Sequence, residues 1–107
     1  MFVVIYQWKL KNGREPEFRE AWRQATQAIY AKRGSLGSQL MQANDGTYYA
    51  VARWPSRDLW LRRSEPGPAD AQASQTMGEM IERSFPPIEL EVTDDMLALE
   101  PSSSGGP

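Results

Sequence analysis

The chain has 107 residues, a formal net charge of −2, and no cysteine or histidine. This length predicts one domain with a modest core, and the charge gives no basic field that would attract nucleic acid or an anionic membrane. The missing residue types exclude disulfides, thiolate nucleophiles, Ser-His-Asp hydrolysis and histidine-ligated haem. No metal site of the usual zinc kind is available, and we expect no cofactor. The first apolar run, residues 1–6, is too short for a signal segment or a membrane span, so we expect a cytoplasmic protein.

The first predicted elements are a strand and a long helix. Residues 2–10 are rich in β-branched and aromatic side chains and end before the turn residues Lys11-Asn12-Gly13, which indicates a strand. The helix spans residues 16–32, with a proline at its start and a cationic last turn followed by glycine. Its apolar residues repeat at spacings of four, three and four, which predicts one buried stripe: Phe18, Trp22, Ala25 and Ile29.

A hairpin is predicted next. Residues 35–43 form a weaker strand, Asn44-Asp45-Gly46 is a strong turn signal, and residues 47–54 form the return strand. Tyr48, Ala50, Ala52 and Trp54 share one face of that strand. The two alanines leave room beside them, which either the side chain of Trp22 or a ligand could fill.

The second half of the chain predicts a broken helix and a last strand. Ser56 and Asp70 are the expected N-caps of two helical pieces, and residues 65–68 separate the pieces. We expect the first piece to continue through Arg63 and the second to end at Phe85-Pro86-Pro87. Residues 88–92 alternate as a half-exposed strand, and residues 100–107 predict a disordered tail.

The order is therefore β-α-β-β-α-β over residues 1–99. It predicts an α+β, ferredoxin-like fold, an antiparallel sheet with both helices on one face. The other face would expose large apolar side chains, and a second copy of the chain would cover them, so we expect a homodimer.

On the opening strand, the helix over residues 16–32, and Trp54-Pro55-Ser56-Arg57-Asp58, the chain resembles the antibiotic biosynthesis monooxygenase (ABM) domain family of the dimeric α+β barrel superfamily. The resemblance covers residues 1 to 97. It implies a cofactor-independent oxidation of electron-rich phenols to quinones by dioxygen, and it matches Trp54 to the family's pocket tryptophan. Two departures are visible. Ala52 stands where many members have an acidic residue, and Arg62-Arg63 stand where many have a histidine in the helix after the tryptophan. The haem-degrading branch uses a histidine ligand in its second helix, and this chain has no histidine, which argues against that branch.

This resemblance yields candidate site residues. Aromatics and hydrogen-bond donors can orient a substrate and stabilise a developing anion without histidine. The expected catalytic residues are Trp54, Arg53 and Asn44, and the expected substrate-binding residues are Tyr6, Trp8, Trp22 and Tyr48.

Each candidate also has a structural interpretation. Trp54 and Trp22 fit core packing, and Tyr6 and Trp8 fit a core or a dimer interface. Asn44 fits a turn, and Arg53 fits an exposed strand or an intersubunit ion pair. Other polar sets fit a solvated surface better than a site, namely the cluster Arg57, Arg62 and Arg63 and the acidic set Glu89, Glu91, Asp94 and Asp95.

Three functions follow from this sequence. The first is a small cofactor-independent monooxygenase acting on an aromatic or quinol-type metabolite. The second is a non-catalytic small-molecule-binding dimer of the same fold. The third, a purely structural oligomerisation module, has less support because nothing else in the chain needs to be oligomerised.

Overall fold

A computed structural model describes residues 1–98, so the predicted tail over residues 100–107 lies outside the described part. The elements in chain order are β1 (Phe2–Leu10), α1 (Glu15–Arg33), β2 (Ser38–Gln42), β3 (Tyr48–Trp54), α2 (Arg57–Leu61), α3 (Ala71–Met80), β4 (Ile81–Ser84) and β5 (Ile88–Glu91). No helix within residues 1–98 combines the length and the apolar character that a membrane crossing requires.

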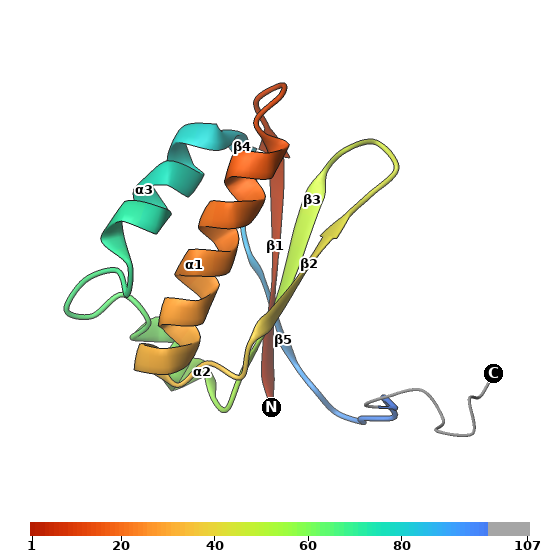
Figure 1. The fold of residues 1–107 in the computed structure, drawn as a ribbon. Helices are drawn as coiled ribbons and strands as arrows, with labels where there is room; N and C mark the ends of the chain where they lie inside the picture. Colours follow the sequence, from red (N-terminus) through yellow and green to blue (C-terminus); the bar gives the residue numbers. More distant parts are fainter. Residues whose placement is uncertain (99–107) are drawn as a thin grey trace, which may run out of the picture.

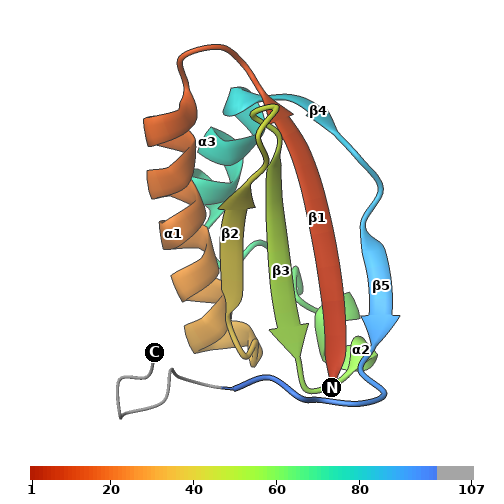
Figure 2. The same cartoon turned by 90° about the vertical axis from the view of Figure 1, so that its right-hand side faces the viewer.

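The five strands form one antiparallel sheet around β1. The order is β2-β3-β1, and the far edge of β1 is shared by β4 at its C-terminal end and β5 at its N-terminal end. In the β1–β3 register, Tyr6 lies opposite Ala50 and Phe2 lies opposite Trp54. Figure 2 shows β2, β3, β1 and β5 side by side.

Both long helices cover the same face of this sheet, called here the inner face (Figure 1). Tyr6 and its alternate neighbours along β1 point to the inner face, where Trp8 packs on Phe18 of α1. This arrangement confirms the predicted ferredoxin-like α+β fold. The opposite, open face carries half-buried Ile5 and Val51, and exposed Ile88 pairs with Ile5 from β5.

Local signals in the sequence explain how the helices begin. The hydroxyl of Ser56 accepts a hydrogen bond from the Leu59 amide at 3.3 Å, and the carboxylate of Asp70 accepts one from the Ala73 amide at 3.0 Å. Each cap satisfies an amide that the first helical turn leaves without a partner. Both predicted N-caps are therefore confirmed.

The hairpin also follows its turn signal. A carboxylate oxygen of Asp45 accepts a hydrogen bond from the Thr47 amide at 2.9 Å, and Gly46 takes a φ of +91° that favours glycine. The hydrogen bond stabilises the charged carboxylate, and it lowers the pKa of Asp45 below its usual value of 3.8.

The prediction that the last helix runs to Phe85 is wrong. Helix α3 ends at Met80, and Ile81 takes extended dihedral angles of −89° and 122°. The chain then becomes β4, because residues 81–84 can pair with the edge of β1 through Trp8 opposite Ser84 and Lys9 opposite Arg83. Tertiary pairing overrides the weak helical signal of these residues.

The prediction that the first helical piece reaches Arg63 is also wrong. Helix α2 ends at Leu61, where the Arg62 amide donates to the carbonyls of Asp58 and Leu59 and closes the last turn. Arg63 therefore belongs to the α2–α3 loop, residues 62–70. Helix α2 is joined to β5 by an ion pair between Arg57 and Glu89, and the hydrogen bond to this carboxylate raises the pKa of Arg57 above its usual value.

The core is divided into two clusters. One contains Phe2, Val4, Ala52, Trp54 and Trp60, and the other contains Leu10, Phe18, Tyr48 and Met80. The middle of the inner face lies between them, where Tyr6 of β1 pairs with Ala50 of β3. The small side chains of Ala50 and Ala52 leave this middle incompletely filled.

Candidate functional site

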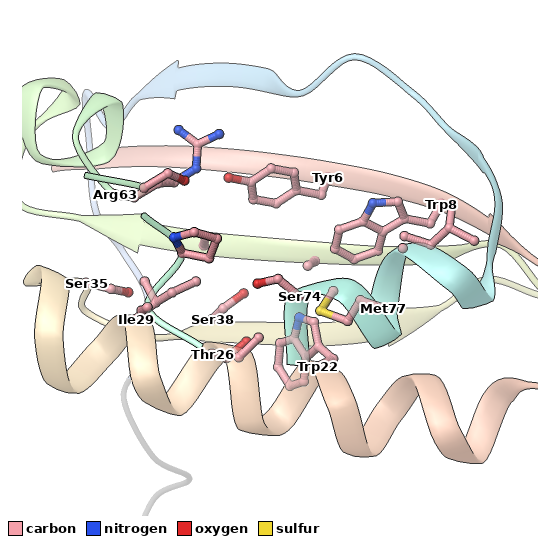
Figure 3. A pocket seen from close by; sticks show the side chains of 18 of the residues that line it. Tyr6, Trp8, Trp22, Thr26, Ile29, Ser35, Ser38, Arg63, Ser74 and Met77 are labelled. Atoms are coloured by element: carbon pink, nitrogen blue, oxygen red, sulfur yellow. The ribbon is translucent and has the colours of Figure 1, made fainter. Parts of the chain in front are cut away.

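A cavity of about 310 Å³ occupies that middle position, between the inner face of the sheet and the helices. Its sheet side comes from Tyr6 and Trp8 of β1 and from Ala50, Ala52 and Trp54 of β3. Its helix side includes Trp22, Thr26 and Ile29 of α1 and Ser74, Met77 and Gly78 of α3. Figure 3 shows Arg63 at one end of the cavity and Trp8 at the other.

The cavity has a mainly aromatic and aliphatic wall. Tyr6 and Trp8 lie two residues apart on one strand and therefore share a face. Their rings stack almost in parallel, at 5.6 Å between centroids and 4° between planes. Phe18 packs edge-on against the Trp8 ring, with 5.4 Å between the two ring centroids. These contacts hold two rings in place along the sheet side, which gives a planar ligand a preformed surface.

Trp54 also lines the cavity, and its side chain carries an unsatisfied polar group. Its side chain is 2% exposed, and its indole Nε1 is buried without a hydrogen-bond partner among residues 1–98. Leaving a buried donor unpaired costs about 1–3 kcal/mol. Trp54 lines the cavity, so this unpaired N–H belongs to a side chain that borders the space a ligand could occupy.

A second polar group is built on Trp60. Its indole Nε1 donates to the hydroxyl oxygen of Tyr6 at 2.7 Å, which leaves the hydroxyl proton of Tyr6 for another acceptor. The guanidinium carbon of Arg63 lies 4.4 Å from the centroid of the Trp60 ring, and Nη1 of Arg63 donates to the Trp60 carbonyl at 2.9 Å. Trp60 therefore positions both a hydroxyl and a cation at the cavity.

The last turn of α1 holds the α2–α3 loop against the helix. Nε and Nη2 of Arg33 donate to the carbonyls of Arg63 and Gly67 at 3.0 and 2.7 Å, and Nζ of Lys32 donates to the Ala69 carbonyl at 3.1 Å. The predicted cationic last turn thus fixes a segment that lines the cavity.

Four of the seven predicted site residues line this cavity: Tyr6, Trp8, Trp22 and Trp54. Trp22 and the two alanines line the same cavity, so the side chain of Trp22 does not fill the whole space beside the alanines, and a ligand there stays a prediction. The functional roles of these four residues stay predictions.

The other three predicted site residues lie elsewhere. Tyr48 is buried against Phe18 and lines a separate surface groove beside Trp22 and Leu40. Asn44 is exposed in the hairpin turn. Arg53 follows the alternation of β3 onto the open face, opposite Val3. Their predicted functional roles stay predictions.

Sequence reasoning missed several lining residues. Thr26 could have been found, because it lies four residues after Trp22 on the same helix face. Ser35 and Ser38 follow α1 and reach the cavity only through the path of the chain into β2, which no periodicity reveals. Arg63 fitted a solvated helix surface by sequence, and it reaches the cavity because α2 ends before it.

No acidic side chain of residues 1–98 lines this cavity. No group of three or more His, Cys, Asp or Glu side chains within residues 1–98 is arranged to hold a metal ion. The acidic set of the last strand lies on exposed positions of β5 and the residues after it.

Comparison with known proteins agrees with this architecture. The family model "Antibiotic biosynthesis monooxygenase" matches residues 1–75, whereas no curated protein matches the sequence. Among solved structures, Rv0793 from Mycobacterium tuberculosis is 18% identical, with a TM-score of 0.71 over 90% of this chain and 98% of its own.

Two further structures share the fold. SnoaB, a cofactor-independent oxygenase from Streptomyces nogalater, is 13% identical, with a TM-score of 0.74 over 89% of this chain and 95% of its own. A variant of MhuD with two manganese protoporphyrin IX molecules bound per active site is 22% identical, with a TM-score of 0.69 over 92% of this chain and 100% of its own. The family model covers more than half of the chain, and the chain therefore belongs to the antibiotic biosynthesis monooxygenase family.

Proposed function

We propose that this protein is a cofactor-independent monooxygenase that acts on a small aromatic or quinol-type metabolite. The observation that carries the proposal is a cavity walled by aromatic rings and lined by Trp54, whose indole N–H is buried without a partner among residues 1–98. The cavity volume of about 310 Å³ lies at the small end of the range for ligand pockets, which suits a compact planar molecule. Family membership agrees with this chemistry.

The reaction needs only the substrate and dioxygen. For an anthrone-type substrate, a ring CH₂ loses a proton to solvent, and the resulting anion passes one electron to dioxygen. The radical and superoxide join in a C–O bond, the peroxide takes up a proton, and loss of water leaves a carbonyl. One oxygen atom ends in the product and the other in water.

The residues around the cavity supply orientation and anion stabilisation. The stacked rings of Tyr6 and Trp8 would hold the substrate plane, and the Trp54 N–H would donate to the oxygen on which negative charge develops. A donor that is unpaired before binding loses no protein partner when it meets the substrate.

A second function, a binding dimer without chemistry, is favoured by one specific observation. None of the lining side chains within residues 1–98 is a carboxylate or a histidine, so no ordinary general base faces the substrate. A substrate that ionises readily in water would react, and one that does not would only bind. Oxygen consumption separates the two functions.

We further propose that two copies associate through the open face of the sheet. This face is apolar around Ile5, Val51 and Tyr49, and β5 adds Ile88 and Leu90, which are 51% and 43% exposed. Neither long helix covers it (Figure 1). An apolar surface of this kind is typical of an association site.

The direct test is oxygen uptake by the purified protein with anthrone and with simple hydroquinones, above the rate in buffer. Ala52→Leu should abolish uptake because the larger side chain enters the cavity from β3. Ala31→Leu is the matched control, because Ala31 is exposed on α1 and does not line the cavity. Circular dichroism must show that both variants remain folded.

Trp54→Phe provides a second test that keeps an aromatic ring and removes the N–H. We expect kcat to fall by about tenfold to a hundredfold, the loss typical of one oxyanion donor or slightly less, while KM changes little. Tight binding of the same compounds without oxygen uptake would refute the enzyme proposal in favour of the binding dimer. Equal rates for Trp54→Phe and the parent protein would refute the role of the indole.

A further inference from the structure

The charge in the cavity points to a more specific ligand than a neutral aromatic. Of the side chains that line the cavity within residues 1–98, that of Arg63 alone carries a formal charge. The five ion pairs found in this part of the chain join other groups, so no carboxylate of the described residues neutralises Arg63. A cation that faces a mainly apolar cavity without a counter-charge favours an anionic ligand.

Arg63 is held rigidly enough to act as a binding group. Its guanidinium lies over the Trp60 ring at 4.4 Å, and Nη1 donates to the Trp60 carbonyl at 2.9 Å. Arg33 also fixes the backbone of Arg63 through its carbonyl. The single side-chain hydrogen bond of Arg63 within residues 1–98 uses one of five N–H donors, and the remaining donors can form the two-pronged contact that carboxylates accept.

Tyr6 adds a neutral donor at the same end of the cavity. Its hydroxyl oxygen already accepts from Trp60 at 2.7 Å, so its proton is directed to an acceptor other than that indole. The guanidinium of Arg63 and the hydroxyl of Tyr6 both contact the side chain of Trp60, and Figure 3 shows them at one end of the cavity. Trp8, Trp22 and Met77 lie toward the other end (Figure 3).

We propose that the ligand of this cavity is an aromatic carboxylic acid whose carboxylate is bound by Arg63 and Tyr6. The rings would lie along the apolar end, and the carboxylate would reach the planar fork of the guanidinium. This inference rests on the proposed function for the aromatic part of the ligand. It adds a carboxylate to the substrate and a specificity-determining role for Arg63 that the reaction itself does not require.

The test compares two ligands that differ in charge and share their shape, 2-naphthoate and 2-naphthamide. Isothermal titration calorimetry at neutral pH measures both with the full-length protein, and neither compound is oxidised during the measurement. We expect the protein to bind naphthoate about tenfold to a hundredfold more tightly, the range for charge-assisted hydrogen bonds. Added salt should reduce this preference, because it screens the charge of a partly exposed arginine.

Variants at two neighbouring arginines provide the matched comparison. Arg63→Gln should remove the preference by lowering the affinity for naphthoate more than the affinity for naphthamide, whereas Arg63→Lys should keep part of the preference through its charge. Arg62→Gln is the control, because Arg62 is exposed and does not line the cavity. It should behave as the parent protein does.

Several results would overturn the inference. They are equal affinities for the two ligands, no binding of either at millimolar concentration, or the same loss of preference in the two glutamine variants. Oxygen uptake decides the proposed function separately. A preference for naphthoate without uptake of oxygen by any hydroquinone would retain the carboxylate site and refute the monooxygenase. Oxygen uptake with neutral anthrone and no preference for naphthoate would retain the monooxygenase and refute the carboxylate site.

Discussion

The hydrogen bond between Trp60 and Tyr6 supports both the core and the cavity, so its removal should have a defined cost. Tyr6→Phe removes the oxygen that accepts from the indole Nε1 at 2.7 Å. Trp60 is 5% exposed and is not among the residues that line the cavity, so little water can replace the lost acceptor. A buried N–H that is left without an acceptor lowers the free energy of unfolding by about 1–3 kcal/mol. Each kcal/mol lowers the Tm of a domain of this size by about 4–8 °C.

A double-mutant cycle isolates this hydrogen bond from other effects of the substitutions. Trp60→Phe removes the donor, together with packing and the contact with Arg63. In that background no indole is left unpaired, so Tyr6→Phe should cost less than about 0.5 kcal/mol. The coupling free energy should then be about 1–2 kcal/mol, within the range for residues in direct contact.

The assay is reversible unfolding in urea followed by far-ultraviolet circular dichroism, which does not depend on the tryptophan that is removed. Tyr30→Phe is the matched control, because Tyr30 is 59% exposed and loses the same hydroxyl without burying a donor. It should change stability by less than about 0.5 kcal/mol. The reasoning would be refuted if Tyr6→Phe were as mild as Tyr30→Phe, or if its cost were equal with and without Trp60.

Three other predictions concern the loop, the open face and the hairpin. Arg33→Gln should weaken naphthoate binding about threefold to tenfold and speed amide exchange in residues 62–70, because the two hydrogen bonds from Arg33 to the loop carbonyls are lost. The control Arg23→Gln, on the exposed side of α1, should change neither the binding nor the exchange. Leu90→Lys should shift the protein to monomer in sedimentation equilibrium, while Leu61→Lys, at a similar exposure on α2, should leave the dimer intact. Asp45→Asn should destabilise the hairpin at neutral pH, and the difference from the parent should vanish as the pH falls below the lowered pKa of Asp45.

Each of these predictions has a contradicting outcome. Unchanged exchange in Arg33→Gln would mean that the tethers do not restrain the loop, and a monomeric parent protein would refute the dimer. For the hairpin, the folded carboxylate has a pKa below its unfolded value of 3.8, so its contribution is full above 3.8 and is lost as the pH falls through the folded pKa. A stability difference that grew toward acidic pH would contradict this sign.

Much of the fold could be read from periodicity and local signals. The alternation of residues 2–10 gave a strand with the observed bounds, and the stripe on α1 gave the buried residues Phe18 and Ala25. The Asn-Asp-Gly turn and the caps Ser56 and Asp70 are satisfied within a few residues of chain. They depend on local geometry that the sequence carries in full.

The boundary between α3 and β4 could not be predicted in this way. Residues 81–84 have no strong preference, and their extended conformation depends on the free edge of β1, which lies more than 70 residues earlier in the chain. The placement of Arg63 has the same origin. It depends on where α2 ends and on how Arg33 holds the following loop.

The candidate site shows the same division between sequence and tertiary structure. Strand alternation by itself separated Arg53 from Trp54, because consecutive residues of a strand point to opposite faces, so the two could not have shared one cavity. The alternation could not say which face is covered, since that depends on where the helices pack. The sequence thus determined which side chains belong together, and the tertiary structure decided that Tyr6, Trp8 and Trp54 face the cavity. It also decided that Arg63 joins them, because packing between distant segments is not encoded in any local pattern.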